Sequence, residues 1–302
     1  MILIGMSSCF VDVNAKTLHG LTPLHFAAKH GKEDVAESEK CVTDKEFVSA
    51  LPTEVDDPMI AYLVQHGAKV NERDQNGLTP LHYAAARGRV MAAKQLLREG
   101  AIVECTDYEE MTPLLMAVKN QHRSLVELLL DSDADYMRMD KWHNNVTPLI
   151  FAAKLGKVDI CDELLNNGAD CFQQDSYHNN ALFCAIMNKH HAVVERLIST
   201  DRGAELLQTK DDSENSPLHV AVRTGSLKTT DLLLNSDTSI WSVNSSEHTP
   251  LHVAAIHGRY GLVSAFDQLS PSEIIYSAFQ SFVYLFWLTS PGAHVGVDFE
   301  LR

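Results

Sequence analysis

A short element recurs along this chain at a nearly constant interval, and it constrains the fold more than any other feature. The stretches "GLTPLHFAAKHGKE" at 20–33, "NGLTPLHYAAARGRV" at 76–90 and "EHTPLHVAAIHGRY" at 247–260 are close copies. The Thr of this element, or its replacement, falls at Thr22, Thr79, Thr112, Thr147, Asn180, Ser216 and Thr249. The intervals are therefore 57, 33, 35, 33, 36 and 33 residues. Such a period predicts a stack of similar units, each of which buries its apolar face against its neighbours.

Each residue type in the element suits one place in a pair of helices. Thr can accept a backbone N–H and cap the first helix, and Pro suits the first helical position because its missing N–H is not needed there. Leu pairs, such as Leu96 with Leu97 and Leu164 with Leu165, predict the buried stripe of the second helix. Glycines are expected to turn the chain between the helices with positive φ, at Gly88, Gly156, Gly225 and Gly258.

The T-P-L-H-x-A signature at a period near 33 resembles ankyrin repeats, each of which is a β-turn followed by two antiparallel helices. The resemblance covers residues 11 to about 266. It implies an all-α fold, an ankyrin-repeat solenoid with short β-hairpin tips. It also implies a non-enzymatic binding array without a cofactor, with recognition of a protein partner on the tips and the inner helices.

The expected organisation follows from the spacing. The segments are an irregular N-terminus at 1–10, a partial and a first ankyrin unit at 11–36, an insertion at 37–58, an array of about six further units at 59–268, and a non-repeat tail at 269–302. The insertion is expected to interrupt the second helix of the first unit, either as a surface excursion or as an error in the gene model. Because the array begins in the middle of a unit without a polar cap, we expect it to continue further towards the N-terminus.

A narrower resemblance concerns the long cytosolic arrays of TRPA-type cation channels. The features that carry it are the repeat with the insertion, and "LLQTKD" at 206–211, which replaces the usual "GADVN" stretch. The chain is thus expected to be a fragment of the cytoplasmic N-terminal region of a channel subunit, associated with a membrane and with other subunits through that channel. The alternative is a free-standing soluble ankyrin scaffold or adaptor that binds an acidic partner on its concave face.

Composition narrows the classes of partner. The chain has 302 residues, 45% of them hydrophobic and 22% charged, which is ordinary for an ordered soluble protein. A net charge of -15 disfavours nucleic acid and anionic membrane surfaces as general partners. The N-terminal stretch 1–14 lacks the basic start of a secretory signal, and the most apolar segment, 274–288, has only fifteen residues. We therefore expect no membrane insertion by this segment itself.

The cysteines are scattered without a CxxC pair, which favours reduced thiols over a disulfide or zinc framework. They are Cys9, Cys41, Cys105, Cys161, Cys171 and Cys184. Cys161 and Cys184 fall at helical positions and are expected to be small core residues. Cys105 and Cys171 precede the tips and are expected to be more exposed.

The candidate metal sites compete with structural interpretations. His25, His82, His219 and His252 share the fourth position of the T-P-L-H element, where the resemblance implies a hydrogen bond that steadies the hairpin. A metal site formed by His248, His252 and His257 is the weaker alternative. A calcium loop from Asp131, Asp133 and Asp135 would need Gly and Glu where the chain has Tyr136 and Trp142. The sequence thus predicts no metal, no cofactor and no enzyme.

One pattern adds to the scaffold. The exposed side of the first helices carries basic residues, with apolar residues one turn earlier. The resulting candidates for binding a partner on the concave face are Lys29, Tyr83, Arg87, Met116, Lys119, Phe151, Lys154, Lys189 and Arg223. A basic row on an acidic protein could bind an acidic peptide or a polyanion. The alternative is that these cations only keep the helices soluble, and that Phe26 and its equivalents lie under the tips.

Overall fold

The computed structural model describes residues 12–35, 57–140, 144–236 and 238–267. Contacts divide the chain into two compact units, the N-terminal unit Met1–Ala181 and the C-terminal unit Leu182–Arg302. The described residues form helices joined by turns, and the one β feature among them is an isolated antiparallel bridge between Asp140 and Val146. The expected all-α repeat fold is confirmed in each unit. We count positions within a repeat from the Thr of the T-P-L-H element, or its replacement, as position 0.

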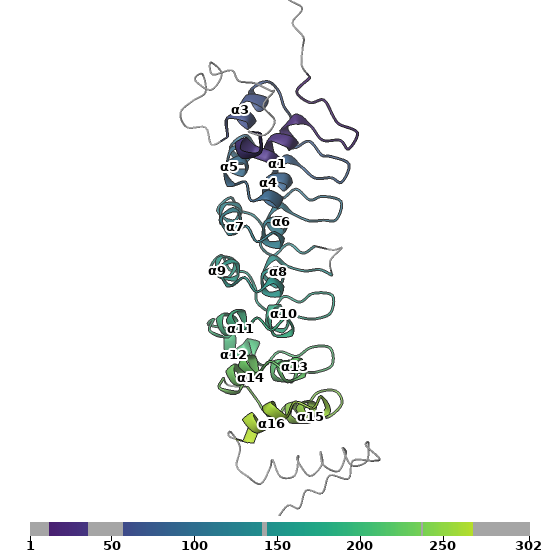
Figure 1. The fold of residues 1–302 in the computed structure, drawn as a ribbon, viewed down its shortest axis with the longest axis vertical. Helices are drawn as coiled ribbons and strands as arrows, with labels where there is room; N and C mark the ends of the chain where they lie inside the picture. The colour runs from purple at the N-terminus through teal and green to yellow at the C-terminus, as the bar shows by residue number, and fades with distance from the viewer. Residues whose placement is uncertain (1–11, 36–56, 141–143, 237, 268–302) are drawn as a thin grey trace, which may run out of the picture. The chain divides into compact units, whose positions relative to one another are not determined.

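The N-terminal unit contains two rows of helices (Figure 1). Its helices are α1 (Pro23–Val35), α3 (Pro58–Gln65), α4 (Pro80–Arg87), α5 (Val90–Arg98), α6 (Pro113–Lys119), α7 (Arg123–Leu130), α8 (Pro148–Leu155) and α9 (Val158–Asn166). The first helices α1, α4, α6 and α8 pack in chain order, and the second helices α3, α5, α7 and α9 pack in a parallel row. The tips, which are the turns before each first helix, extend from the row of first helices (Figure 1).

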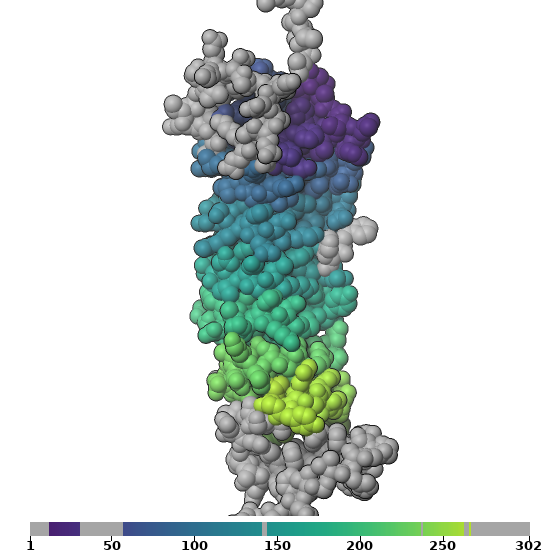
Figure 2. Space-filling view, in the orientation of Figure 1, coloured from purple at the N-terminus to yellow at the C-terminus, as the bar shows by residue number. Residues whose placement is uncertain are grey.

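The C-terminal unit repeats this arrangement. Its helices are α10 (Ala181–Met187), α11 (His191–Ile198), α12 (Gly203–Leu206), α13 (Pro217–Thr224), α14 (Leu227–Leu234), α15 (Pro250–Ile256) and α16 (Tyr260–Asp267). The first helix α13 packs on α15, and the second helix α14 packs on α11 and α16. In the space-filling view the repeats within each unit lie directly against one another (Figure 2).

Leucines and alanines form the core between the two rows. Leu81 at position 2 and the pair Ala84 and Ala85 are buried, as are most of their equivalents in the other repeats, whereas Ala27 in the first repeat and Leu251 and Ala255 in the last are only partly covered. Of the predicted leucine pairs, Leu96 and Leu164 are fully buried, whereas the second member of each pair is only partly covered. The prediction of a two-leucine stripe was wrong for that second member, because consecutive helical residues point about 100° apart.

Helix starts and the turns between helices follow the sequence closely. Thr112 Oγ1 accepts the backbone N–H of Leu115 at 3.2 Å, and Thr147 Oγ1 accepts that of Ile150 at 3.3 Å. The predicted glycines have positive φ, 68° at Gly88 and 73° at Gly225. A Cβ at Gly88 would lie 2.5 Å from Nδ1 of His122 in the next repeat. Glycine is therefore required there both for its backbone conformation and for the close packing of the next repeat.

Five of the described tips are closed by an Asp or Asn five residues before position 0, at Asp74, Asp107, Asp175, Asp211 and Asn244. Asp107 Oδ1 accepts the N–H groups of Glu109 (2.9 Å) and Met111 (2.8 Å), and the Asp107 N–H donates to the Met111 carbonyl at 3.1 Å. Neighbouring tips are joined through their backbones, since the Tyr108 N–H donates to the Asn76 carbonyl at 3.0 Å. The tips are thus rigid turns linked in series.

An asparagine joins the base of each of the first two tips to the next repeat. Asn71 Nδ2 donates to the Gly100 carbonyl at 3.0 Å, and its Oδ1 accepts the Ile102 N–H at 2.9 Å. Asn14 bridges Gly67 and Lys69 in the same way. Asn14 and Asn71 both lie eight residues before position 0, and each amide satisfies a carbonyl and an N–H of the following repeat.

The irregular intervals have separate structural origins. The 35-residue interval contains a longer tip, in which the Asp140 N–H donates to the Val146 carbonyl, six residues on rather than four. The 36-residue interval accommodates the short helix α12. Within the 57-residue interval, α3 starts with its own cap, because Asp57 Oδ1 accepts from the Met59 N–H at 3.1 Å. The second helix of the first repeat is therefore intact and follows the extra residues, rather than being interrupted by them as predicted.

Some predictions concern residues outside the described ranges. These are the irregular N-terminus 1–10, nearly all of the insertion 37–58, the tail 269–302 with its apolar stretch 274–288, and the side chains of Cys9, Cys41 and Trp142. The division of the chain into these segments stays a prediction.

Candidate interaction surface

The histidine at position 3 connects two repeats. The Thr79 N–H donates to Nδ1 of His82 at 3.1 Å, and Nε2 of His82 lies 3.0 Å from the Met111 carbonyl oxygen of the next repeat. Because Nδ1 is an acceptor, the ring proton resides on Nε2, which donates to Met111. Burial lowers the pKa of His82 to about 4, so the ring is neutral at pH 7.

The equivalent histidines have the same geometry. His25 Nε2 lies 3.1 Å from the Leu78 carbonyl, and His219 Nε2 lies 2.9 Å from the His248 carbonyl. Burial lowers the pKa of His25, His219 and His252 as well. His252 accepts the Thr249 N–H at 3.3 Å, but it belongs to the last described repeat, and no carbonyl of a following repeat is among the described residues. This geometry supports the structural role expected for these rings.

The metal alternatives gain no support from the positions of their residues. The rings of His248 and His252 are stacked with centroids 6.0 Å apart, and Nδ1 of His252 is occupied by the helix cap. The carboxylate of Asp135 accepts the Met137 N–H at 2.8 Å and closes a turn. Within 12–35, 57–140, 144–236 and 238–267, no three His, Cys, Asp or Glu side chains are grouped closely enough to hold a metal ion.

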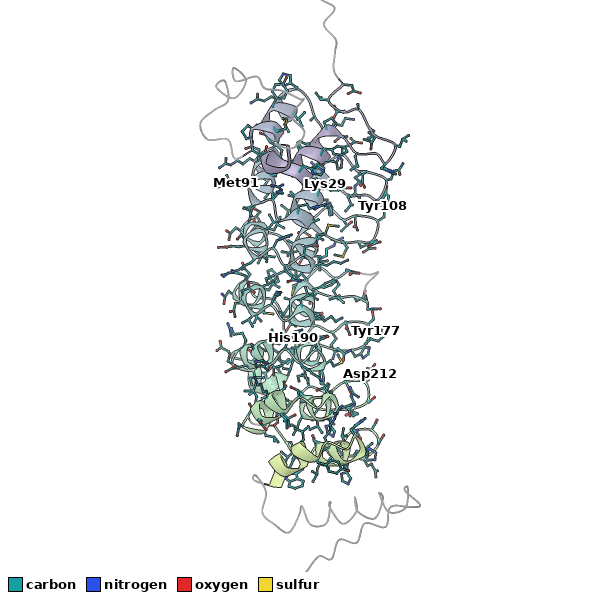
Figure 3. The ribbon with its side chains drawn as sticks, in the orientation of Figure 1. Lys29, Met91, Tyr108, Tyr177, His190 and Asp212 are labelled. Atoms are coloured by element: carbon teal, nitrogen blue, oxygen red, sulfur yellow. The ribbon has the colours of Figure 1, made fainter. Side chains whose placement is uncertain are left out.

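The cations of the predicted concave face differ in their contacts in the N-terminal unit. Lys29 Nζ lies over the Tyr83 ring, 5.8 Å from its centroid, on the side of the first helices (Figure 3). Lys154 Nζ lies 3.1 Å from Asp175 Oδ2, a tip residue whose side chain is 1% exposed. Arg87 and Lys119 are exposed, and neither forms an ion pair with another described residue. Two of the four cations therefore support the fold, and two are available to a ligand.

The two cations in the C-terminal unit occupy different positions from each other. Arg223 lies at position 7 in α13 and is exposed. Lys189 was predicted on the exposed side of a first helix, but α10 ends at Met187 and Lys189 has a φ of 61°. The prediction was wrong because Lys189 holds position 9, the left-handed turn position that glycine fills at Gly225. Its side chain therefore extends from a turn and not from the helix.

The apolar row at position 4 is partly exposed in the N-terminal unit. Phe26 is 40% exposed, and Tyr83, Met116 and Phe151 are partly exposed. The hydroxyl of Tyr83 donates to Asp74 Oδ2 at 2.8 Å, and burial together with this bond raises its pKa. The tips therefore touch this row without covering it. In the C-terminal unit the same position is buried, at Cys184, Val220 and Val253.

A second set of basic residues was not predicted from the sequence. At position 10, just before the second helix, the side chain in three repeats reaches back to the first helix of the preceding repeat. His122 Nε2 lies 3.2 Å from the Ala86 carbonyl, Arg259 Nη2 donates to the Arg223 carbonyl at 3.2 Å, and Arg89 donates to the His30 carbonyl. The contacts of His122 and Arg259 satisfy carbonyls in the last turn of α4 and α13, where a positive charge is favourable. The available signal was the recurrence of Arg, His or Lys ten residues after position 0.

The cysteines are more uniform than predicted. Cys161 and Cys184 are fully buried, as expected. Cys105 and Cys171 were expected to be exposed, but each is only 6% exposed. The reason at Cys105 is that its Sγ packs under the helix cap, 3.4 Å from Thr79 Oγ1 and 3.7 Å from His82 Nδ1. Burial raises the pKa of this thiol, which disfavours the reactive thiolate.

None of the helices in the described ranges combines the length and apolar character needed to cross a membrane.

The exposed surface of the N-terminal unit has three parts, which are the exposed sides of the first helices, the tips and the outer side of the second helices. We define the inner face of the N-terminal unit as the exposed sides of its first helices, formed by Phe26, Lys29, Tyr83, Arg87, Met116, Lys119, Phe151 and Lys154.

Comparison with known protein families agrees with this architecture. The family model for ankyrin repeats in three copies matches residues 53–140, 138–210 and 202–266, and the model for a single ankyrin repeat matches 19–38. Together these matches include every T-P-L-H element and its replacements.

Curated proteins that resemble the chain include three with different overall functions. "Transient receptor potential cation channel subfamily A member 1" of Drosophila melanogaster is 28% identical over 149 residues, which is 42% of this chain and 12% of that protein. "Rabankyrin-5" of Mus musculus is 28% identical over 211 residues, 65% of this chain and 15% of that protein. "Neurogenic locus Notch protein" of Drosophila melanogaster is 34% identical over 129 residues, 41% of this chain and 4% of that protein. The chain thus spans 15% or less of each of these relatives.

Proposed function

We propose that this chain, which belongs to the ankyrin-repeat family, is a non-enzymatic protein-interaction module that binds its partner on the inner face of the N-terminal unit. The observation that carries this proposal is the partly exposed row of large side chains at position 4, Tyr83, Met116 and Phe151, on helices fixed by packing on both sides. Large apolar side chains on a rigid support are the usual anchors of a protein interface, because little entropy is lost when they bind.

Photo-crosslinking tests this proposal. A photoreactive amino acid at Met116 should crosslink a protein partner, whereas the same residue at Met91 should not. Met91 is the matched control, because it is 54% exposed but lies on the second helix α5, away from the tips (Figure 3). The captured partner is then purified, and its affinity is measured for the wild-type chain and for Met116→Asp. Crosslinking at Met91 alone, or equal affinity of the two chains, would place the interface elsewhere.

We propose further that this array is the cytoplasmic part of a TRPA-like cation channel subunit, and that it joins other subunits through that channel. Two observations favour this origin. One is the match to the Drosophila channel protein, and the other is the unusual "LLQTKD" stretch that forms the end of α12 and the turn after it. The competing origin is a soluble scaffold or adaptor, which is supported by the longer match to Rabankyrin-5 at the same identity.

The complete transcript separates these origins. A channel subunit requires several in-frame apolar helices of about 20 residues downstream of the array. A transcript that lacks them would exclude the channel and leave the scaffold, without affecting the interaction function of the array.

A further inference from the structure

The cations of the inner face differ in whether another residue of the chain already contacts them. The two without such a contact among the described residues lie on α4 and α6. Lys29 is engaged with the Tyr83 ring, and Lys154 is engaged with Asp175. Arg87 and Lys119 are exposed in adjacent repeats and have no ion pair among the described residues. An exposed cation without an internal partner is the group that can gain most from an anionic ligand.

Each available cation lies beside a large apolar side chain. Arg87 follows Tyr83 by four residues, and Lys119 follows Met116 by three residues, so each pair shares one side of its helix. The ring of Phe26 shows that positions 4 and 8 meet, because it stacks on His30 with centroids 6.2 Å apart. The surface at α4 and α6 therefore combines two cations with two apolar contacts.

We propose, building on the interaction function above, that Arg87 and Lys119 bind an extended acidic segment of a partner protein whose carboxylates are three residues apart. Helices packed side by side, as α4 and α6 are, lie about 8–10 Å apart. A polyproline II segment rises about 9 Å in three residues and returns each third side chain to the same side. Acidic residues at i and i+3 thus match the two cations, and apolar residues between them meet Tyr83 and Met116.

The acidic groups nearest this surface are held by other donors, and Asp107 attracts Lys119 only as a minor electrostatic contribution, without an ion pair between described residues. Asp74 accepts two backbone N–H groups through Oδ1 and the Tyr83 hydroxyl through Oδ2. Asp107 Oδ1 is likewise occupied by two N–H groups of its turn. Repulsion of an acidic segment by the net charge of -15 is largely screened at separations beyond about 8 Å, the Debye length at physiological salt.

The C-terminal unit supplies a matched control. Arg223 has the same charge and exposure as Lys119 and the same position 7, but its position-4 neighbour Val220 is fully buried. A ligand attracted by charge alone would use Arg223 as well as the inner face. A ligand that also needs the apolar contacts would ignore it.

The test is fluorescence anisotropy with the full chain and a labelled (Glu-Leu-Pro)4 peptide, in which every third residue is acidic and proline favours polyproline II. The double variant Arg87→Gln/Lys119→Gln should bind about tenfold more weakly, while Arg223→Gln should stay within about twofold of wild type. A (Lys-Leu-Pro)4 peptide should not bind. A peptide of the same composition with its four glutamates adjacent should bind more weakly than the spaced one.

Several results would overturn the proposal: unchanged affinity of the double variant, an equal loss in Arg223→Gln, or equally tight binding of a single-stranded dT oligomer. Circular dichroism of each variant establishes that the exposed substitutions leave the helices intact. Selection of a displayed random peptide library on the full chain then separates this proposal from the interaction function. Selected peptides without acidic residues that bind wild type and fail on Met116→Asp would refute the acidic ligand and retain the interface. A selection that yields no binder would count against both.

Discussion

The two units of the molecule use the same repeat but expose different side chains at one position. In the N-terminal unit, position 4 holds Tyr83, Met116 and Phe151, which are partly exposed beside the tips. In the C-terminal unit the same position holds Val220 and its equivalents, which are buried. Both units keep the same pairs of helices, while the side chain at position 4 is partly exposed in one and buried in the other. The candidate surface therefore depends on which side chain stands at position 4 and not on the helix arrangement.

An inner repeat and the last described repeat also differ in how tightly the same structural residue is enclosed, whereas His219, an inner residue of the C-terminal unit, is as buried as His82. His82 is fully buried, with its cap on one side and the Met111 carbonyl of the next repeat on the other. His252 makes the same cap but is half-buried. Gly88 and Gly258 differ likewise, since a Cβ would meet His122 at the first and no atom of the described residues within 4 Å at the second. The same residue at the same position of two repeats should therefore contribute differently to the free energy of unfolding. Paired substitutions test this.

The largest difference is expected for the turn glycines. Gly88→Ala should destabilise the chain by about 3 kcal/mol, because left-handed backbone costs about 1–2 kcal/mol and the new methyl group overlaps the His122 ring. Gly258→Ala should cost only the backbone part, about 1 kcal/mol. Urea denaturation followed by circular dichroism measures both. Equal costs would mean that the contact between repeats at Gly88 is loose and that an inner repeat is no more tightly packed at this position than the last described one.

The capping histidines should show a smaller difference in the same direction. His82→Ala leaves the Thr79 N–H and the Met111 carbonyl without partners in a buried place, and we expect it to cost about 2 kcal/mol. His252→Ala removes one partly exposed cap and should cost about 1 kcal/mol. The same denaturation experiment applies, with His257→Ala as the exposed control. A metal-dependent change in the wild-type midpoint would contradict the structural role.

Acid should act through these same rings. The folded-state pKa of His82 is about 4, below the 6.5 of an unperturbed histidine. The unfolded chain therefore binds protons first as the pH falls. The contribution of His82 is complete above pH 6.5 and is lost between pH 6.5 and 4, at up to about 1.4 kcal/mol per pH unit. An NMR titration of the histidine ring protons should give a lower midpoint for His82 than for His252. Identical midpoints would show that the two rings are equally enclosed.

The smallest expected change in unfolding free energy concerns the bridge between neighbouring repeats of the N-terminal unit. Glu104 stands where the earlier repeats have Asn14 and Asn71, and its Oε1 accepts the Asp135 N–H at 2.8 Å. Its Oε2 is buried and has no hydrogen-bond partner in the structure. Glu104→Asn should supply the missing amide donor and raise the unfolding free energy by about 1 kcal/mol. Glu109→Asn, at the exposed tip, is the control, and a destabilised Glu104→Asn protein would show that the two bridges are not equivalent.

The sequence predicted the architecture because its signals are local. Thr, Pro and Gly act on the backbone within a few residues, so helix starts and turns could be placed without knowledge of the fold. The failures have non-local causes. Lys189 was misplaced because a lysine fills a position that usually needs glycine. Cys105 was thought exposed because the cap that covers it is 26 residues away.

The candidate surface was predictable only in part. Exposure of the cations follows from helical spacing, but their contacts do not. The ion pair of Lys154 with Asp175 joins residues 21 apart, and the contact of Lys29 with Tyr83 crosses the 57-residue interval. The sequence alone therefore could not separate the engaged cations from Arg87 and Lys119. The sequence also did not connect Arg89, His122 and Arg259. Their common role is a hydrogen bond to a carbonyl of the preceding first helix, and that carbonyl can be identified only from the structure.

The series of bonds between adjacent tips has a kinetic consequence. The Tyr108 N–H reaches only the tip before it, and Ser176 reaches only the tip at Asn144. No backbone bond of this kind among the described residues of the N-terminal unit skips a repeat. Folding of that unit can therefore nucleate in any pair of neighbouring repeats and propagate in either direction, like a zipper. A pulling force applied across it would open it in steps of about one repeat, and the force at each step would report the strength of a single junction.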